Sequence, residues 1–199
     1  MEITNLQQDF SLGLIAFCAA LLVLVNNWRY LLGILSLQYV GVMVLVAVSW
    51  PLEIAVVKLI AGWMAVSILM LTYLNLPDAV SEQLEIPFFR QLFHGLVAVL
   101  IGLVGISLQP TAILWFLSAS PQQTLAGLLL LGLGLLQLGI NSQGIRTVVG
   151  LLTVLSGFEI LYASLEASVL MTGLLAVLNI GIAFVGAYLL VSSQLEVEI

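Results

Sequence analysis

Seven long apolar runs, separated by short polar gaps, fill almost the whole chain. A helix that spans a membrane needs about 20 mostly apolar residues, and the runs are close to that length. They do not alternate polar and apolar residues, as the strands of a membrane β-barrel would. The sequence therefore predicts an all-α bundle of seven transmembrane helices. The predicted spans are residues 10–25, 30–49, 52–74, 91–108, 124–140, 147–165 and 169–191.

The spans form two groups of three around a central segment, within one integral membrane domain that covers residues 1–199. Residues 10–74 hold the first group, and residues 124–199 hold the second. Residues 75–123 between them contain an acidic loop, the fourth span and a short apolar segment, 111–118. That segment is too short to cross a bilayer, so it is expected at the membrane interface or in a re-entrant position.

A weak internal repeat relates the two groups. The stretch RYLLGILS, which begins at Arg29, is similar to RTVVGLLT, which begins at Arg146. Each stretch follows one apolar run and precedes two more predicted helices. The matching glycines, Gly33 and Gly150, are expected to mark places where helices pack closely.

Three arginines predict the orientation of the bundle. Arg29, Arg90 and Arg146 follow the first, third and fifth spans. With seven spans, all three lie on the same side of the membrane, and basic residues are enriched in cytoplasmic loops. The sequence therefore predicts an outside N-terminus and a cytoplasmic C-terminus.

The low charge content excludes several classes of protein. Only 7% of the residues are charged, against about one quarter in a soluble domain. No basic cluster exists to bind nucleic acid. No sequence motif for a nucleotide, a metal, a flavin or an iron–sulfur cluster is present. We therefore expect no cofactor and no enzyme activity of the chain on its own.

Two charged residues lie inside predicted spans, where charge is costly and usually functional. Glu159 is about 13 residues past Arg146, or roughly 20 Å along a helix. A carboxyl group away from water holds its proton more readily, which a proton relay requires; the alternative is a structural role in packing. Lys58 lies roughly 10 Å into its span, with Glu53 five residues earlier. A lysine there either pairs with a carboxylate or extends toward the interface.

Neutral polar residues also occur in the spans. Asn179, Gln137 and Gln38 can form hydrogen bonds between helices, but an amide cannot carry a proton unaided. Asn179 is kept as a candidate for a proton path together with Glu159, Lys58 and Glu53.

The last three spans resemble a known family. The stretch GIRTVVGLLTVLSGFEILYASLEASVLMTGLLAVLNIGIAFVGAYLL, residues 144–190, is similar to the K subunit of respiratory complex I and to the C subunit of Mrp-type cation/proton antiporters. The longer arrangement resembles the E component of membrane-bound hydrogenases related to formate hydrogenlyase. By this resemblance, Arg146 corresponds to the family's cytoplasmic arginine. Glu159 lies one helical turn beyond the expected position of the first membrane acid, and Asn179 stands where complex I has a second one.

The resemblance implies a non-catalytic membrane subunit of a proton- or cation-translocating complex. Such a subunit would pack against larger antiporter-like subunits and line part of their proton path, while any redox chemistry would belong to those partners. It would reside in an energy-converting membrane of a prokaryote or an organelle, in particular the inner or plasma membrane. The alternative is a stand-alone small ion transporter or channel that uses Glu159 and Lys58, which the internal repeat favours.

Overall fold

The computed structural model describes residues 2–76, 88–116, 119–140, 144–166 and 168–195. Within these residues it contains seven α-helices and no β-strand. Each helix includes a segment that is long and apolar enough to cross a membrane. The helices are α1 (Glu2–Leu24), α2 (Trp28–Val46), α3 (Leu52–Leu74), α4 (Phe88–Trp115), α5 (Pro121–Ile140), α6 (Gly144–Ala163) and α7 (Val169–Leu195).

Several predicted boundaries need correction. Helix α1 begins at Glu2 and not at residue 10, α2 ends at Val46 and not at residue 49, and α7 continues to Leu195 and not only to residue 191. Residues 111–115 are not a separate interfacial element, because α4 continues through Pro110 as far as Trp115; residues 117–118 of that predicted segment lie outside the described residues. Proline removes one helical hydrogen bond, but transmembrane helices tolerate this where neighbouring groups compensate, and apolar residues continue on both sides of Pro110. The sixth helix begins at Gly144 rather than at residue 147, so Arg146 lies in its first turn and not in a turn between helices.

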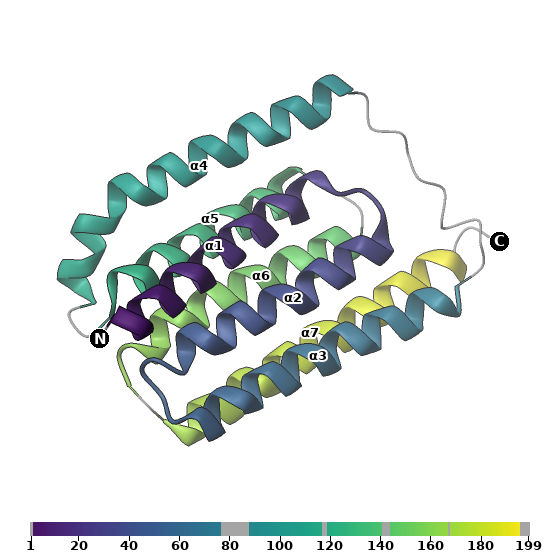
Figure 1. Ribbon diagram of the computed structural model, residues 1–199. Coiled ribbons are helices and arrows are strands. Elements are labelled where there is room, and N and C mark those ends of the chain that lie inside the picture. The colour runs from purple at the N-terminus through teal and green to yellow at the C-terminus, as the bar shows by residue number, and fades with distance from the viewer. Residues whose placement is uncertain (1, 77–87, 117–118, 141–143, 167, 196–199) are drawn as a thin grey trace.

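Six of the helices form two neighbouring layers, and the remaining helix, α4, lies outside them (Figure 1). In the first layer α2 packs between α1 and α3, and in the second layer α6 packs between α5 and α7. The layers meet along three pairs, α1 with α5, α2 with α6, and α3 with α7. Helix α4 packs only on α5 and α1 among the described contacts. The two predicted groups of three helices are therefore the two layers.

Equivalent residues of the two layers are separated by a constant number of positions in the sequence. Arg29 and Arg146 are 117 positions apart, and so are Leu52 and Val169, the first residues of α3 and α7. Because successive helices reverse direction, each helix runs parallel to its partner in the other layer (Figure 1). The starts of α2, α4 and α6, which carry the three arginines, share one end of the bundle. We call it the arginine end.

Glycines set the close contact between α5 and α6. A Cβ atom added at Gly157 would lie 2.8 Å from the Leu131 backbone nitrogen and 2.9 Å from the Gly127 carbonyl oxygen. At Gly150 it would lie 3.2 Å from the Gly134 carbonyl oxygen. Small residues allow helices in a membrane to approach in this way, so the prediction for Gly150 agrees with the structure.

The matching prediction for Gly33 is wrong. Gly33 is exposed, and no described atom lies within 4 Å of a Cβ added there. The face of α2 that carries Gly33 points away from the other helices, so no close helix contact involves this glycine.

The buried apolar residues form two clusters. One cluster lies toward the arginine end and includes Leu31 and Leu35 of α2 and Val149 and Leu152 of α6. The other occupies the opposite end, continues along α1, and joins α2 and α6 through Val42, Leu45, Ile160 and Ala163, among others.

A set of buried polar residues extends from Gln137, near the end of α5, to the middle of the bundle. We call them the polar layer: Gln38, Tyr39, Lys58, Gln137, Thr153, Ser156, Glu159 and Asn179.

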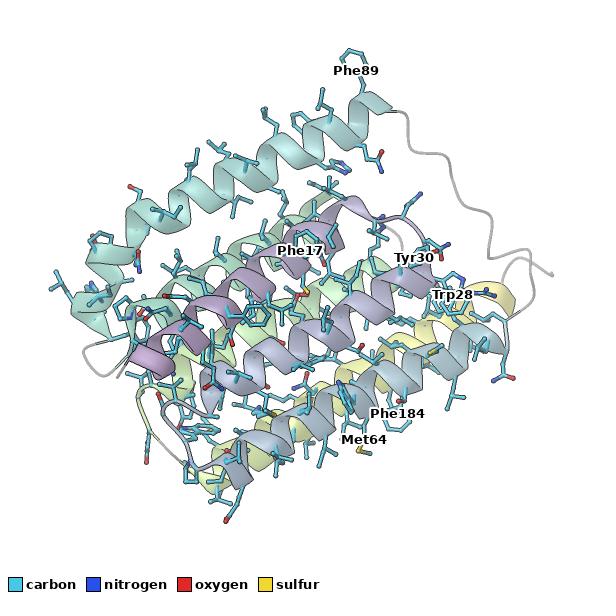
Figure 2. All side chains as sticks on the ribbon, viewed as in Figure 1. Phe17, Trp28, Tyr30, Met64, Phe89 and Phe184 are labelled. Atoms are coloured by element: carbon cyan, nitrogen blue, oxygen red, sulfur yellow. The ribbon has the colours of Figure 1, made fainter. Side chains whose placement is uncertain are left out.

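Large apolar side chains also cover the outside of the bundle. Phe17, Met64, Phe89 and Phe184 project from four different helices (Figure 2), and Phe89 is 84% exposed. An apolar outer surface of this extent indicates contact with lipid or with other membrane proteins. This surface and the helix lengths agree with an integral membrane protein.

Candidate functional site: a buried ion pair between the two layers

Lys58 and Glu159 form an ion pair in the middle of the bundle. The Lys58 Nζ atom donates to Glu159 Oε1 at 2.5 Å, and the side chains are 2% and 1% exposed. Lys58 lies on α3 in the first layer and Glu159 on α6 in the second. Two alternatives were open for Lys58. In the structure Lys58 pairs with a carboxylate, and its side chain does not extend toward an interface.

Two neutral side chains extend the pair into a chain of hydrogen bonds. Asn179 on α7 donates through Nδ2 to Glu159 Oε1 at 2.9 Å. The Tyr39 hydroxyl on α2 donates to Asn179 Oδ1, also at 2.9 Å. Both side chains are buried. Four helices, two from each layer, therefore meet at one carboxylate.

Close packing positions the tyrosine. A Cβ atom added at Gly62 of α3 would lie only 2.5 Å from the Tyr39 ring. Gly62 thus leaves the space in which the ring lies flat against α3 and carries its hydroxyl to Asn179. Gly62 and Asn179 occupy equivalent positions in the two layers, 117 residues apart.

The carboxylate retains one oxygen for further interactions. Glu159 Oε1 accepts from both Lys58 and Asn179, while Oε2 is buried and has no hydrogen-bond partner among the described residues. For a carboxyl group in a low-dielectric site, held beside an ammonium group, the charge state is coupled to that of the partner. Chemically, the arrangement is suited to accepting and releasing one proton.

Three of the four candidates for a proton path come together at this site. Glu159, Lys58 and Asn179 are in direct contact. Glu53 is not part of the site, because it lies exposed in the first turn of α3, while Lys58 points into the bundle. Tyr39 was missed by the sequence reasoning. A tyrosine in the middle of a span, rather than near its ends where aromatic belts form, is the signal that could have identified it.

The two arginines assigned to cytoplasmic loops have different environments. Arg29 is exposed, and its guanidinium lies 5.2 Å from the centre of the Trp28 ring. Arg146 is buried, and its Nη2 donates to the Val25 carbonyl oxygen at 2.5 Å and to Asn26 Oδ1 at 2.8 Å. Arg146 therefore joins the start of α6 to the end of α1, where free carbonyl groups attract a positive charge.

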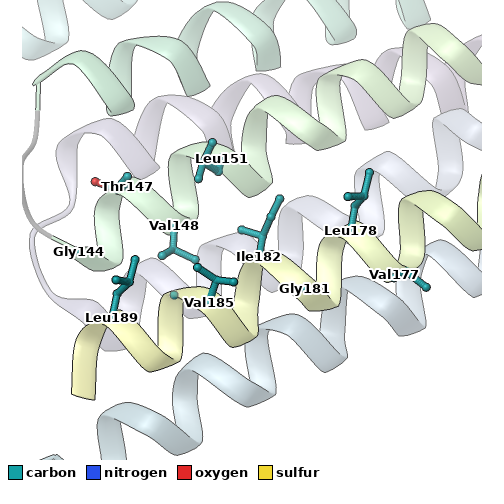
Figure 3. A pocket seen from close by; sticks show the side chains of 11 residues that line it. Gly144, Thr147, Val148, Leu151, Val177, Leu178, Gly181, Ile182, Val185 and Leu189 are labelled. Atoms are coloured by element: carbon teal, nitrogen blue, oxygen red, sulfur yellow. The ribbon is translucent and has the colours of Figure 1, made fainter. Parts of the chain in front are cut away.

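The described residues also form an apolar groove away from the ion pair. A groove of about 560 Å³ between α6 and α7 is lined by side chains such as Leu151, Leu178, Val185 and Leu189 (Figure 3). Its walls are almost entirely apolar, which suits a lipid chain or a neighbouring helix. Among the described residues, no group of three His, Cys, Asp or Glu side chains is placed to hold a metal ion.

Comparisons with protein-family models, with characterised proteins and with solved structures found no significant match to this chain.

Proposed function

We propose that the chain is a membrane subunit of a proton- or cation-translocating complex of the complex I, Mrp antiporter or membrane-bound hydrogenase type. The observation that carries this proposal is the buried Lys58–Glu159 pair with its neutral partners Asn179 and Tyr39. Ionisable residues inside a membrane are costly and usually serve transport. The subunit packs against larger antiporter-like subunits, lines part of their proton path, and leaves any redox chemistry to them.

The surface of the bundle supports an assembled state. Helix α4 is exposed along most of its length, and the groove between α6 and α7 is lined by apolar side chains. In a membrane, packing between such surfaces drives association. We place the complex in an energy-converting membrane, the inner or plasma membrane of a prokaryote or its organellar counterpart.

Purification from the native membrane in mild detergent tests the assembly. We expect larger membrane proteins to co-purify with the chain in fixed proportion. If the chain is isolated as a single species and transports ions by itself in liposomes, the subunit proposal is wrong.

A single substitution tests the role of the carboxylate. Glu159→Gln keeps the size and the hydrogen-bonding end of the side chain but cannot exchange a proton near neutral pH. We expect intact complexes with slower proton movement. Glu166→Gln is the matched control, because Glu166 is exposed at the end of α6 and its loss should leave the rate unchanged. Proton movement at the normal rate in Glu159→Gln complexes would make the carboxylate purely structural.

The second candidate function is a stand-alone ion transporter or channel. The observation that favours it is the position of the site, where two residues from each of two parallel layers meet. Transporters are often built from repeats with the substrate site between them. Ion flux in liposomes that contain only this chain, abolished by Glu159→Gln, would support this candidate instead.

The orientation also belongs to the proposal: N-terminus outside, C-terminus and arginine end in the cytoplasm. A cysteine introduced by Glu198→Cys, in a chain that also carries Cys18→Ala, should react with an impermeant thiol reagent only from the cytoplasmic side. Reaction only from the outside would reverse the orientation.

A further inference from the structure

Five buried polar atoms of the polar layer have no hydrogen-bond partner among the described residues. They are both amide atoms of Gln38, both amide atoms of Gln137, and Oε2 of Glu159. Gln38 is 1% exposed and Gln137 is 2% exposed. A buried polar atom without a partner is costly, and in proteins such atoms are commonly satisfied by internal water.

A third buried glutamine shows that this bundle can satisfy an amide with protein groups. Gln123 on α5 is 1% exposed, and its Nε2 donates to the Leu45 carbonyl oxygen and to the Ser49 hydroxyl, both at 2.8 Å. Gln38 and Gln137 differ from Gln123 in lacking such protein partners, and outside the polar layer Trp50 Nε1 is also buried without a partner among the described residues.

The unpartnered atoms are staggered from the arginine end toward the ion pair. Gln137 lies three residues before the end of α5, and its Cβ would lie 3.2 Å from a Cβ at Gly150 of α6. Glu159 is nine residues further along α6, or about 13 Å. The space between them along α6 holds two buried hydroxyl residues, Thr153 and Ser156.

Gln38 lies between these two levels on the neighbouring helix. It is on the same face of α2 as Leu35, one turn toward the arginine end, and Val42, one turn the other way. Leu35 and Leu152 of α6 belong to one apolar cluster, and Val42 and Ile160 of α6 belong to the other. Gln38 is therefore level with the part of α6 that ends at Glu159.

We propose that Gln137, Gln38 and Glu159 Oε2 bind a file of internal water molecules that connects the arginine end of the bundle to the ion pair. Each amide offers a donor and an acceptor to water, and the hydroxyls of Thr153 and Ser156 add acceptors. A proton delivered along these waters adds to Oε2, leaves a neutral water behind, and converts the carboxylate to a carboxylic acid. The inference deepens the proposed function by assigning the side from which Glu159 exchanges its proton.

Solid-state NMR of the full chain in lipid bilayers tests the water directly. With ¹⁵N-labelled glutamine, magnetisation transferred from water should reach the side-chain amides of Gln38 and Gln137. The Gln123 amide lines a polar pocket at the other end of the bundle and is the positive reference for water transfer. Gln38→Met, Gln137→Met and Gln123→Met assign the three signals by removing them one at a time. Water transfer to Gln38 and Gln137 much weaker than to Gln123 would overturn the proposal.

Hydrogen exchange tests the connection to the ion pair. After transfer to D₂O, the Lys58 ammonium hydrogens of the Gln38→Met chain should exchange about tenfold more slowly than in the unmodified chain, a factor that corresponds to losing about one hydrogen bond. Gln123→Met should leave this rate unchanged. An unchanged rate in Gln38→Met would overturn the connection. Neither measurement requires transport or partners, so failure here and failure of the proposed function are separate outcomes.

Discussion

Breaking the Lys58–Glu159 pair from one side should destabilise the bundle far more than removing both charges together. Lys58→Met keeps the length of the side chain but removes the ammonium group, and Glu159→Gln keeps the shape and the Asn179 hydrogen bond but removes the negative charge. Each single variant leaves a buried charge without its partner. The two side chains are 2% and 1% exposed, so the remaining charge lies away from the surface of the bundle.

The expected magnitudes follow from this burial. Removing one partner of a buried ion pair costs about 3–5 kcal/mol, whereas replacing both by neutral groups of similar volume is often neutral or stabilising. Either remaining side chain can reduce its cost by becoming neutral, which places the single variants toward the lower value. The loss of unfolding free energy in the double variant should therefore be at least about 2 kcal/mol smaller than the sum of the losses in the two single variants.

Reversible unfolding in mixed detergent micelles measures the four free energies of unfolding that this cycle needs. A control cycle combines Lys58→Met with Glu166→Gln, whose carboxylate is exposed. That control should be additive within about 0.5 kcal/mol. If the Lys58–Glu159 cycle is additive to the same degree, the two residues are not energetically coupled, and the site described above is wrong.

Two further predictions concern the packing of the bundle. Gly157→Ala should lower the free energy of unfolding by about 1–3 kcal/mol, because the new Cβ would lie 2.8 Å from the backbone of α5. Gly33→Ala should be neutral or should stabilise the bundle by up to about 1 kcal/mol. Thermal unfolding of both variants in detergent checks this prediction, and equal effects would argue against the close α5–α6 contact. Arg146→Ala should lower the free energy of unfolding by about 1.5–3 kcal/mol, because it removes charge-assisted hydrogen bonds to the end of α1. The exposed Arg29→Ala should lower it by about 0.5 kcal/mol or less. Equal losses for the two variants in the same unfolding assay would contradict the buried contact of Arg146.

Most of the fold could be predicted from the sequence. Seven runs of apolar residues determine seven helices, because only a helix satisfies every backbone group within one segment in lipid. The bounds of α3 were predicted to the residue, since Pro51 precedes the helix and a polar segment follows it. The end of α4 was not, because a proline that stops a helix in water is tolerated in the interior of a transmembrane helix.

The site was predictable only in part. Lys58 and Glu159 stand out in the sequence because charge inside an apolar run is costly, and that cost implies partners without identifying them. Glu53 was the nearer carboxylate in the sequence, yet Glu159, 101 residues away, is the partner. The pairing depends on α3 and α6 both facing the interior between the layers, and no local pattern contains that information.

The sequence by itself determined the helices, the membrane environment and the two charges that need compensation, because these follow from the transfer of each residue between water and lipid. Only the tertiary structure decided which groups meet. It brought Tyr39 to Asn179 across 140 positions and carried Arg146 from a predicted loop into a buried contact with α1. It also placed Gly33 on the outside and Gly150 between helices, although their surrounding sequences are similar. The physical reason is that side-chain contacts depend on how whole helices are rotated and paired, which is settled by packing over the entire bundle.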